Sequence, residues 1–122
     1  MSRKILIVDD EADIRSTLEG RLKSAGFETC AAANAAEAFQ KVEVENPDLI
    51  LLDIMLPGTP GNELARILKE KRKGKKDIPV IYLTALRKES EQKAQGAAVG
   101  GHIIFAKPFD FTELLNAIRS LI

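Results

Sequence analysis

The sequence has few of the residues that mark several common classes of protein. It contains no tryptophan, one tyrosine, one histidine and one cysteine among 122 residues. The single cysteine, Cys30, excludes an internal disulfide and fits a reducing compartment; in its apolar segment we expect a buried, inert thiol. Charge of one sign is not in excess either, because 18 basic and 18 acidic residues give a formal net charge of +0. No global field therefore attracts nucleic acid or anionic lipid to this chain.

Long apolar runs are also missing. None approaches the ~20 residues that span a membrane, and the N-terminus lacks a signal-peptide pattern. We therefore expect a cytoplasmic protein without membrane contact. With 45% hydrophobic residues, the chain is long enough for one sizeable core and too short for a comfortable second one. The sequence shows no linker and no internal repeat, so we expect one domain over residues 1–122.

Short apolar runs alternate with helical patterns along the chain. The runs predict strands over 4–8, 27–31, 49–52, 78–83 and 103–106, and a helix follows each of them. Two helix starts have capping-box spacing, Asn34 with Glu37 and Asp110 with Glu113. The helix expected over 87–99 has the weakest support, because Gly96 costs about 1 kcal/mol relative to alanine there. Strict alternation predicts an α/β fold, in which helices cover both faces of a mostly parallel sheet.

Asp53 is a lone carboxylate at the end of a continuous apolar run, just before Pro57-Gly58 turns the chain. Open α/β sheets usually keep their chemistry at the carboxyl ends of their strands. Other polar residues fall at such ends too: Asp9 and Asp10 after the first strand, Thr84 after the fourth and Lys107 after the fifth. Each taken singly has a structural explanation as a cap, a turn residue or a solvated charge. Because they occur at four strand ends, they are expected to converge on one site.

The charges of these residues indicate a metal ion. Three carboxylates packed together repel one another, and without a cation one of them would hold its proton. Oxygen-only ligands with room for water suit Mg²⁺ best among hard divalent ions. Lys107 alone cannot balance three carboxylates, but a lysine together with Mg²⁺ can. A phosphoryl group added to Asp53 would find suitable partners in Mg²⁺, the Lys107 ammonium and the Thr84 hydroxyl.

Four motifs resemble those of the receiver domains of two-component response regulators, and the resemblance spans essentially the whole chain. The motifs are Val8-Asp9-Asp10-Glu11, Leu52-Asp53-Ile54-Met55-Leu56-Pro57-Gly58, Leu83-Thr84-Ala85 and Lys107-Pro108-Phe109. The resemblance implies a flavodoxin-like (βα)5 fold, doubly wound in three layers, with strand order 2-1-3-4-5. It also implies that Asp53 is the phosphoacceptor, that Asp10 binds Mg²⁺ directly and Asp9 through water, and that the Met55 backbone carbonyl is a further ligand. Thr84 and Lys107 would contact the phosphoryl group.

The function that the resemblance implies is a phosphoacceptor switch in a two-component phosphorelay. A sensor histidine kinase or a histidine phosphotransfer protein would donate the phosphoryl group to Asp53 in an Mg²⁺-dependent reaction. The chain would be a signalling domain rather than an enzyme, although it assists its own phosphorylation and dephosphorylation. Phosphorylation would change the protein-binding surface formed by the helix over 87–99, the strand over 103–106 and the last helix. A downstream protein or a fused output domain would read this surface, without direct nucleic-acid binding by this chain.

Two regions bear on specificity and readout. Kinase specificity in this family lies largely on the first helix and neighbouring loops, which points to Ile14, Arg15, Leu18 and the Thr59-Pro60 loop. Ile104 stands where many receivers have an aromatic switch residue, and isoleucine has no hydroxyl with which to exchange partners. His102 is expected in a turn, with a structural or surface role.

Three alternatives remain open at this point. One is a receiver-fold adaptor that works without phosphorylation. Another is a flavodoxin-like cofactor binder, but the segment after the first strand is acidic and free of glycine, which repels a phosphate. The third is a phosphatase of the haloacid dehalogenase type, which would need an Asp-x-Asp pattern that Asp9-Asp10-Glu11 lacks.

Overall fold

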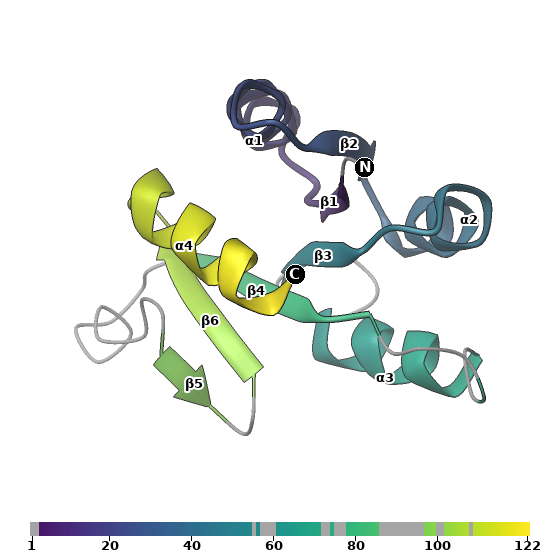
Figure 1. Cartoon of the computed structure of the whole chain (residues 1–122). Helices are drawn as coiled ribbons and strands as arrows, with labels where there is room; N and C mark the ends of the chain where they lie inside the picture. Colours follow the sequence, from purple (N-terminus) through teal and green to yellow (C-terminus); the bar gives the residue numbers. More distant parts are fainter. Residues whose placement is uncertain are drawn as a thin grey trace.

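One sheet runs through the centre of the structure (Figure 1). The computed structural model describes residues 3–54, 56, 61–71, 74, 78–85, 97–99, 102–107 and 109–122. The strands in chain order are β1 (Lys4–Val8), β2 (Glu28–Ala32), β3 (Leu49–Asp53), β4 (Val80–Ala85), β5 (Ala97–Val99) and β6 (His102–Lys107). Their spatial order is β2-β1-β3-β4-β6-β5, and all neighbours are parallel except β5 and β6. Because β6 is the fifth of the predicted strands, the predicted order 2-1-3-4-5 is confirmed.

Helices cover both faces of the sheet. In the part of the chain that the structure describes they are α1 (Ala12–Ser24), α2 (Ala35–Glu45), α3 (Gly61–Lys71) and α4 (Phe111–Leu121). In Figure 1, α1 and α4 lie on one face, and α2 and α3 on the other. No helix among the described residues is both long and apolar enough to cross a membrane.

The alternation of side chains along the central strands explains the two cores. Ile5 and Ile7 of β1 pack in the cluster with α1 and α4, whereas Leu6 and Val8 pack in the cluster with α2 and α3. β3 divides in the same way, and all five of its residues are buried. Because these strands are buried on both faces, their sequences are continuous apolar runs rather than alternating apolar and polar residues.

The predicted helix ends are confirmed where the structure describes them. The α2 N-cap Asn34 accepts a hydrogen bond from the Glu37 nitrogen, and Glu37 Oε1 accepts one from the Ala33 nitrogen. The Asp110 side chain caps α4 in the same way, with the Glu113 nitrogen 3.2 Å away. After α1, Gly26 has φ +97° and its nitrogen donates to the Lys23 carbonyl, as in a Schellman motif. These local signals mark the starts of α2 and α4 and the end of α1.

The helix predicted over 87–99 is wrong for its last three residues. Ala97–Val99 form β5, which pairs antiparallel with β6, so that Val99 lies opposite His102. His102 therefore begins a strand, not a turn as predicted. The helical pattern there rested on small alanines, and main-chain pairing with β6 outweighs so weak a preference. The rest of the predicted helix lies outside the described residues.

Candidate functional site

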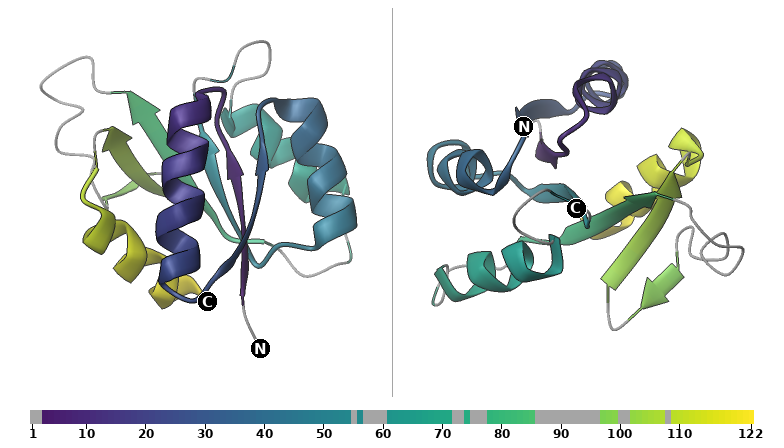
Figure 2. Two further views of the ribbon diagram at one scale, coloured as in Figure 1. Left: turned by 90° about the horizontal axis from the view of Figure 1, so that it is seen from above. Right: turned by 180° about the vertical axis from the view of Figure 1, so that it is seen from behind.

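The predicted site residues gather at one edge of the sheet. Asp53 is the last residue of β3, Lys107 the last of β6, and Asp9 directly follows β1. In Figure 2 (left) the arrowheads of β1, β2 and β4 point towards this edge, and both chain termini lie at the opposite one. β4 and β6 extend further than predicted, so that Thr84 and Lys107 belong to the strands themselves.

The register places these strand ends side by side. Asp53 is the Cα partner of Leu83, and Thr84 and Lys107 are the partners of Ala106 and Ala85. Just beyond β3, the Ile54 nitrogen donates to the Leu83 carbonyl at 2.9 Å. The backbones of β3, β4 and β6 therefore bring their carboxyl ends to one place, as the sequence predicts.

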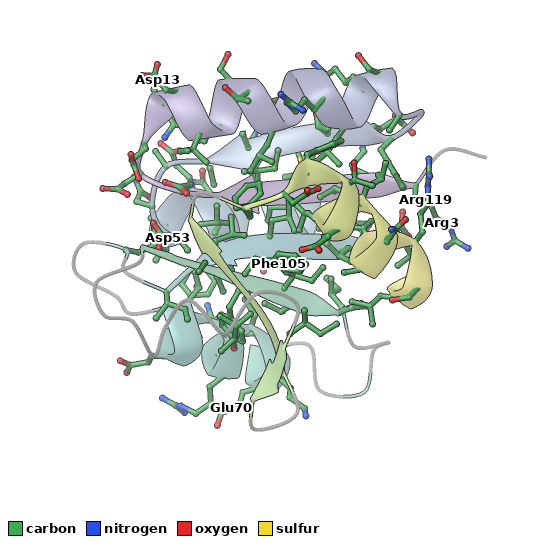
Figure 3. The ribbon with its side chains drawn as sticks, turned by 90° about the vertical axis from the view of Figure 1, so that its left-hand side faces the viewer. Arg3, Asp13, Asp53, Glu70, Phe105 and Arg119 are labelled. Atoms are coloured by element: carbon green, nitrogen blue, oxygen red, sulfur yellow. The ribbon has the colours of Figure 1, made fainter. Side chains whose placement is uncertain are left out.

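Four carboxylates meet at this edge. Asp9, Asp10, Glu11 and Asp53 each offer an oxygen, and these atoms all lie within 4.8 Å of one another. The Asp9 and Asp53 side chains are buried, with relative exposures of 0% and 3%, whereas Asp10 and Glu11 are exposed. Figure 3 shows Asp53 at the end of the molecule where α1 begins, far from Arg3 and Arg119. The sequence identified three of these carboxylates and missed Glu11.

A tight turn between β1 and α1 explains why Glu11 joins the cluster. The Glu11 nitrogen donates to Asp9 Oδ1 at 2.9 Å, which folds the chain back within two residues. The Asp9 nitrogen continues the sheet by donating to the Ala32 carbonyl at 3.1 Å. On the helix side, Arg15 Nη1 donates to the Asp9 carbonyl at 2.7 Å. The signal available in the sequence was an aspartate two residues before a glutamate at a strand-to-helix junction.

The donor set fits a hard divalent cation. All four groups offer oxygen, which Mg²⁺ prefers, and the exposed pair leaves access for water. Opposite ligands of one Mg²⁺ lie at most about 4.2 Å apart, because each Mg–O distance is about 2.1 Å. The four oxygens lie within 4.8 Å of one another, a limit close to that span, so they are near enough together to share one Mg²⁺. A mixed shell of carboxylates and water suits this geometry.

Several predicted contributors lie outside the described residues. They are Met55 with its carbonyl, the Thr59-Pro60 loop and Pro108. For Thr84 and Lys107 the structure gives the backbone position only. Their predicted contacts with a phosphoryl group remain predictions.

An aliphatic side chain occupies the position on β6 at which many receivers have an aromatic switch residue. Ile104 is the Cα partner of Tyr82, and it packs, partly buried, against the α2 and α3 side of the core. Burial raises the pKa of the Tyr82 hydroxyl above its ordinary value. Phe105 points to the other face, where it is 1% exposed under α1 and α4. Phe105 therefore does not replace the missing aromatic residue at position 104.

A groove of about 430 Å³ runs between α1 and the start of α4. Its apolar lining includes Ile14 and Leu18 of α1 and Phe111 of α4. Arg21 also lines it, with its guanidinium carbon 5.3 Å from the centre of the Phe111 ring. Two of the residues that the sequence connects with kinase specificity, Ile14 and Leu18, thus face a concave surface.

Comparison with known proteins decides the family. Residues 5–119 match the response regulator receiver domain. The chain belongs to this family. The receiver domain is 44% identical over 122 residues to the phosphate regulon transcriptional regulatory protein PhoB of Pseudomonas aeruginosa. The match covers 100% of the chain and 52% of PhoB, so the chain spans about half the length of that relative.

Solved structures agree with this assignment. The chemotaxis protein CheY4 of Vibrio cholerae superposes with a TM-score of 0.81 at 30% identity, over 100% of both chains. The response regulator TrrA of Thermotoga maritima, solved in complex with Mg(2+)-BeF, gives 0.76 at 32% identity, covering 98% of this chain and 99% of its own. The flavodoxin-like fold is thereby confirmed, and the chain is a signalling domain with the phosphoacceptor function of two-component response regulators.

Proposed function

We propose that residues 1–122 form one receiver domain in which Asp53 is the phosphoacceptor. The observation that carries this proposal is the burial of Asp53 at the end of β3, with its oxygen inside the carboxylate cluster. Burial restricts the orientation of the Asp53 carboxylate, and a fixed orientation favours its action as a nucleophile. The adjacent strand ends supply Thr84 and Lys107 at the same edge.

The carboxylates are proposed to hold Mg²⁺, with Asp10, Asp53 and the Met55 carbonyl as direct ligands and Asp9 acting through water. The four carboxylate oxygens within 4.8 Å of one another support a shared cation, and Mg²⁺ usually keeps several waters beside one or two carboxylates. The Mg(2+)-BeF complex of TrrA, which is 32% identical to this chain, supports Mg²⁺ as the bound ion. When bound, Mg²⁺ supplies the positive charge that a phosphoryl group needs among carboxylates.

In the proposed reaction, an Asp53 carboxylate oxygen forms a bond to phosphorus as the P–N bond of a phosphohistidine breaks. The bonding electrons leave on the imidazole nitrogen, which takes up a proton. The transferring group carries its charge on three peripheral oxygens, so positioned partners do most of the catalysis. The Thr84 hydroxyl and the Lys107 ammonium are the proposed partners. Attack by water on the resulting acyl phosphate would release phosphate and restore the carboxylate.

The proposed donor is a sensor histidine kinase or a histidine phosphotransfer protein. The groove between α1 and α4 supports docking of such a partner, because it offers apolar side chains beside the charged Arg21 and Asp110. Output would pass to a downstream protein or a fused domain. The relative PhoB is named a transcriptional regulatory protein, and about half of its length lies beyond the match. A cytoplasmic location stays a prediction from the sequence.

Intact mass after incubation with acetyl phosphate tests the proposal. We expect a gain of one phosphoryl group with Mg²⁺ and none with a chelator. Asp53→Asn should gain no group under either condition, while its circular dichroism shows that it is folded. A folded wild-type protein without an adduct would contradict the proposal and favour an adaptor that works without phosphorylation. Two observations disfavour the cofactor-binder and phosphatase alternatives. The turn after β1 presents carboxylates, which repel the phosphate of a cofactor, and Asp9-Asp10-Glu11 lacks the Asp-x-Asp pattern of the phosphatase.

A further inference from the structure

The Arg15 side chain reaches back from α1 to the turn that carries three of the four clustered carboxylates. Its Nη1 donates to the Asp9 carbonyl at 2.7 Å, a short distance for a charge-assisted hydrogen bond. We infer that Arg15 is a positioning residue, which holds this turn in the form that binds Mg²⁺. The inference rests on the proposed Mg²⁺ site. It assigns Arg15 a role inside the domain, whereas the sequence suggested a contact with the kinase.

The position of Asp9 explains why its carbonyl needs such a partner. β1 ends at Val8 and α1 begins at Ala12, so Asp9 lies between a sheet ladder and a helix. Asp9 is fully buried, and a buried carbonyl without a hydrogen bond is costly. Arg15 supplies this bond from the first turns of α1, where its side chain is half-buried. The helix and the turn are thereby tied together by one side chain.

The other bonds of the turn transmit this restraint to the carboxylates. The Asp9 nitrogen is tied to the Ala32 carbonyl, and Asp9 Oδ1 is tied to the Glu11 nitrogen. The Arg15 nitrogen in turn donates to the Glu11 carbonyl at 3.1 Å. Rotation of the Asp9 peptide would therefore move the Asp10 and Glu11 side chains together. Fixing that peptide keeps their oxygens within reach of Asp53.

The Arg15 charge acts in the opposite direction, because a guanidinium repels Mg²⁺. Asp10 and Glu11 are exposed, so solvent and salt screen this repulsion. The hydrogen bond acts on the backbone itself, and groups that orient metal ligands commonly contribute 10–100-fold to affinity. We therefore expect the positioning effect to dominate.

Calorimetric titration of the unphosphorylated protein with Mg²⁺ tests the inference. Arg15→Met removes the hydrogen bond and the charge, and we expect it to weaken Mg²⁺ binding about tenfold. Arg119→Met is the matched control: it removes the same charge from an exposed position on α4, at the opposite end of the molecule (Figure 3), and should not change the affinity. Unchanged or tighter binding by Arg15→Met would overturn the inference, and tighter binding would show that charge repulsion dominates.

A kinetic measurement separates positioning from a general loss of structure. With acetyl phosphate as donor, the Mg²⁺ concentration for half-maximal phosphorylation of Arg15→Met should rise about tenfold, while the rate at saturating Mg²⁺ stays within about twofold of the wild type. A lower rate at saturation without a shift of the midpoint would overturn the inference. If Arg15→Met does not fold, Arg15→Gln keeps a polar side chain that is too short to reach the Asp9 carbonyl, and unchanged Mg²⁺ affinity in that variant would overturn the inference. A wild-type protein that binds no Mg²⁺ would instead refute the proposed function.

Discussion

Asp9 and Asp53 extend from two neighbouring strands into the same buried space. Val8 and Leu52, the residues before them, are Cα partners in the β1–β3 ladder. Both carboxylates are buried, and their oxygens lie within 4.8 Å of each other. Like charges at this distance oppose folding, and a divalent cation between them removes the repulsion. We therefore expect the carboxylate repulsion to lower the stability of the metal-free protein and to favour the binding of a metal ion.

Mg²⁺ should stabilise the folded domain measurably. At a Mg²⁺ concentration of 100 times Kd, the free energy of unfolding should rise by about 2.7 kcal/mol relative to the protein in chelator. Urea denaturation with and without Mg²⁺ measures this difference. In Asp10→Asn most of the gain should disappear, because one of the clustered carboxylates is gone.

The matched control for this prediction is Asp13→Asn. Asp13 is an exposed aspartate in the first turn of α1 (Figure 3), and it is not one of the four clustered acids. The Asp13→Asn variant should keep the full response to Mg²⁺. Equal stability of the wild type in Mg²⁺ and in chelator would contradict the prediction.

Much of the fold and the site could be predicted because the signals are local or follow from simple topology. The apolar run before Asp53 marks a doubly buried strand, and in a parallel sheet strand ends meet at one edge whatever the loops do. At Asn34 and Asp110, a spacing of three residues between the cap and a glutamate predicts a hydrogen bond from the glutamate nitrogen to the cap side chain, and the structure has both bonds. Such features need no knowledge of tertiary contacts.

The features of the fold and the site that the sequence did not predict depend on contacts between segments distant in sequence or on the direction of a side chain. Whether Ala97–Val99 form a helix or a strand depends on pairing with β6, since three small apolar residues prefer neither strongly. Glu11 enters the cluster because of one side-chain hydrogen bond to Asp9. The Arg15 side chain could equally have pointed to solvent, and nothing in its spacing indicates the Asp9 carbonyl.

Removing the α2 cap should destabilise the domain. Asn34 Oδ1 accepts from the Glu37 nitrogen at 2.9 Å, so Asn34→Ala leaves that donor at the helix start without its partner. We expect the free energy of unfolding to fall by about 1 kcal/mol. Urea denaturation at neutral pH measures it. Asn116→Ala, an exposed substitution inside α4, should be neutral or slightly stabilising, because alanine is the better helix former. Similar losses in both variants would refute a specific capping role.

The pair formed by Lys4 and Glu45 should make stability depend on acid pH. Lys4 Nζ lies 2.8 Å from Glu45 Oε1, and this hydrogen bond lowers the pKa of Glu45 below its ordinary 4.5. The unfolded chain then takes up the proton at a higher pH than the folded one. The pair therefore contributes to the free energy of unfolding above about pH 4.5, and this contribution is lost as the pH falls through the lowered pKa of Glu45.

Glu45→Gln tests this pH dependence. Urea midpoints measured between pH 7 and pH 3 should fall less steeply in Glu45→Gln than in the wild type, with the two proteins converging at the acid end. Glu43→Gln removes the same charge from an exposed position on the same helix and should follow the wild-type curve. A constant difference between Glu45→Gln and the wild type at every pH would argue against the pair.

Phe105 and Ile104 should differ strongly in their contributions to stability, although they are adjacent on β6. Phe105 is 1% exposed under α1 and α4, so Phe105→Ala should cost about 3–5 kcal/mol in urea denaturation. Ile104→Ala should cost less than about 2 kcal/mol, because its side chain is only partly buried on the other face. Because Phe105 is packed inside the core, its side chain cannot turn outward without opening that core. Equal losses in the two variants would contradict this division.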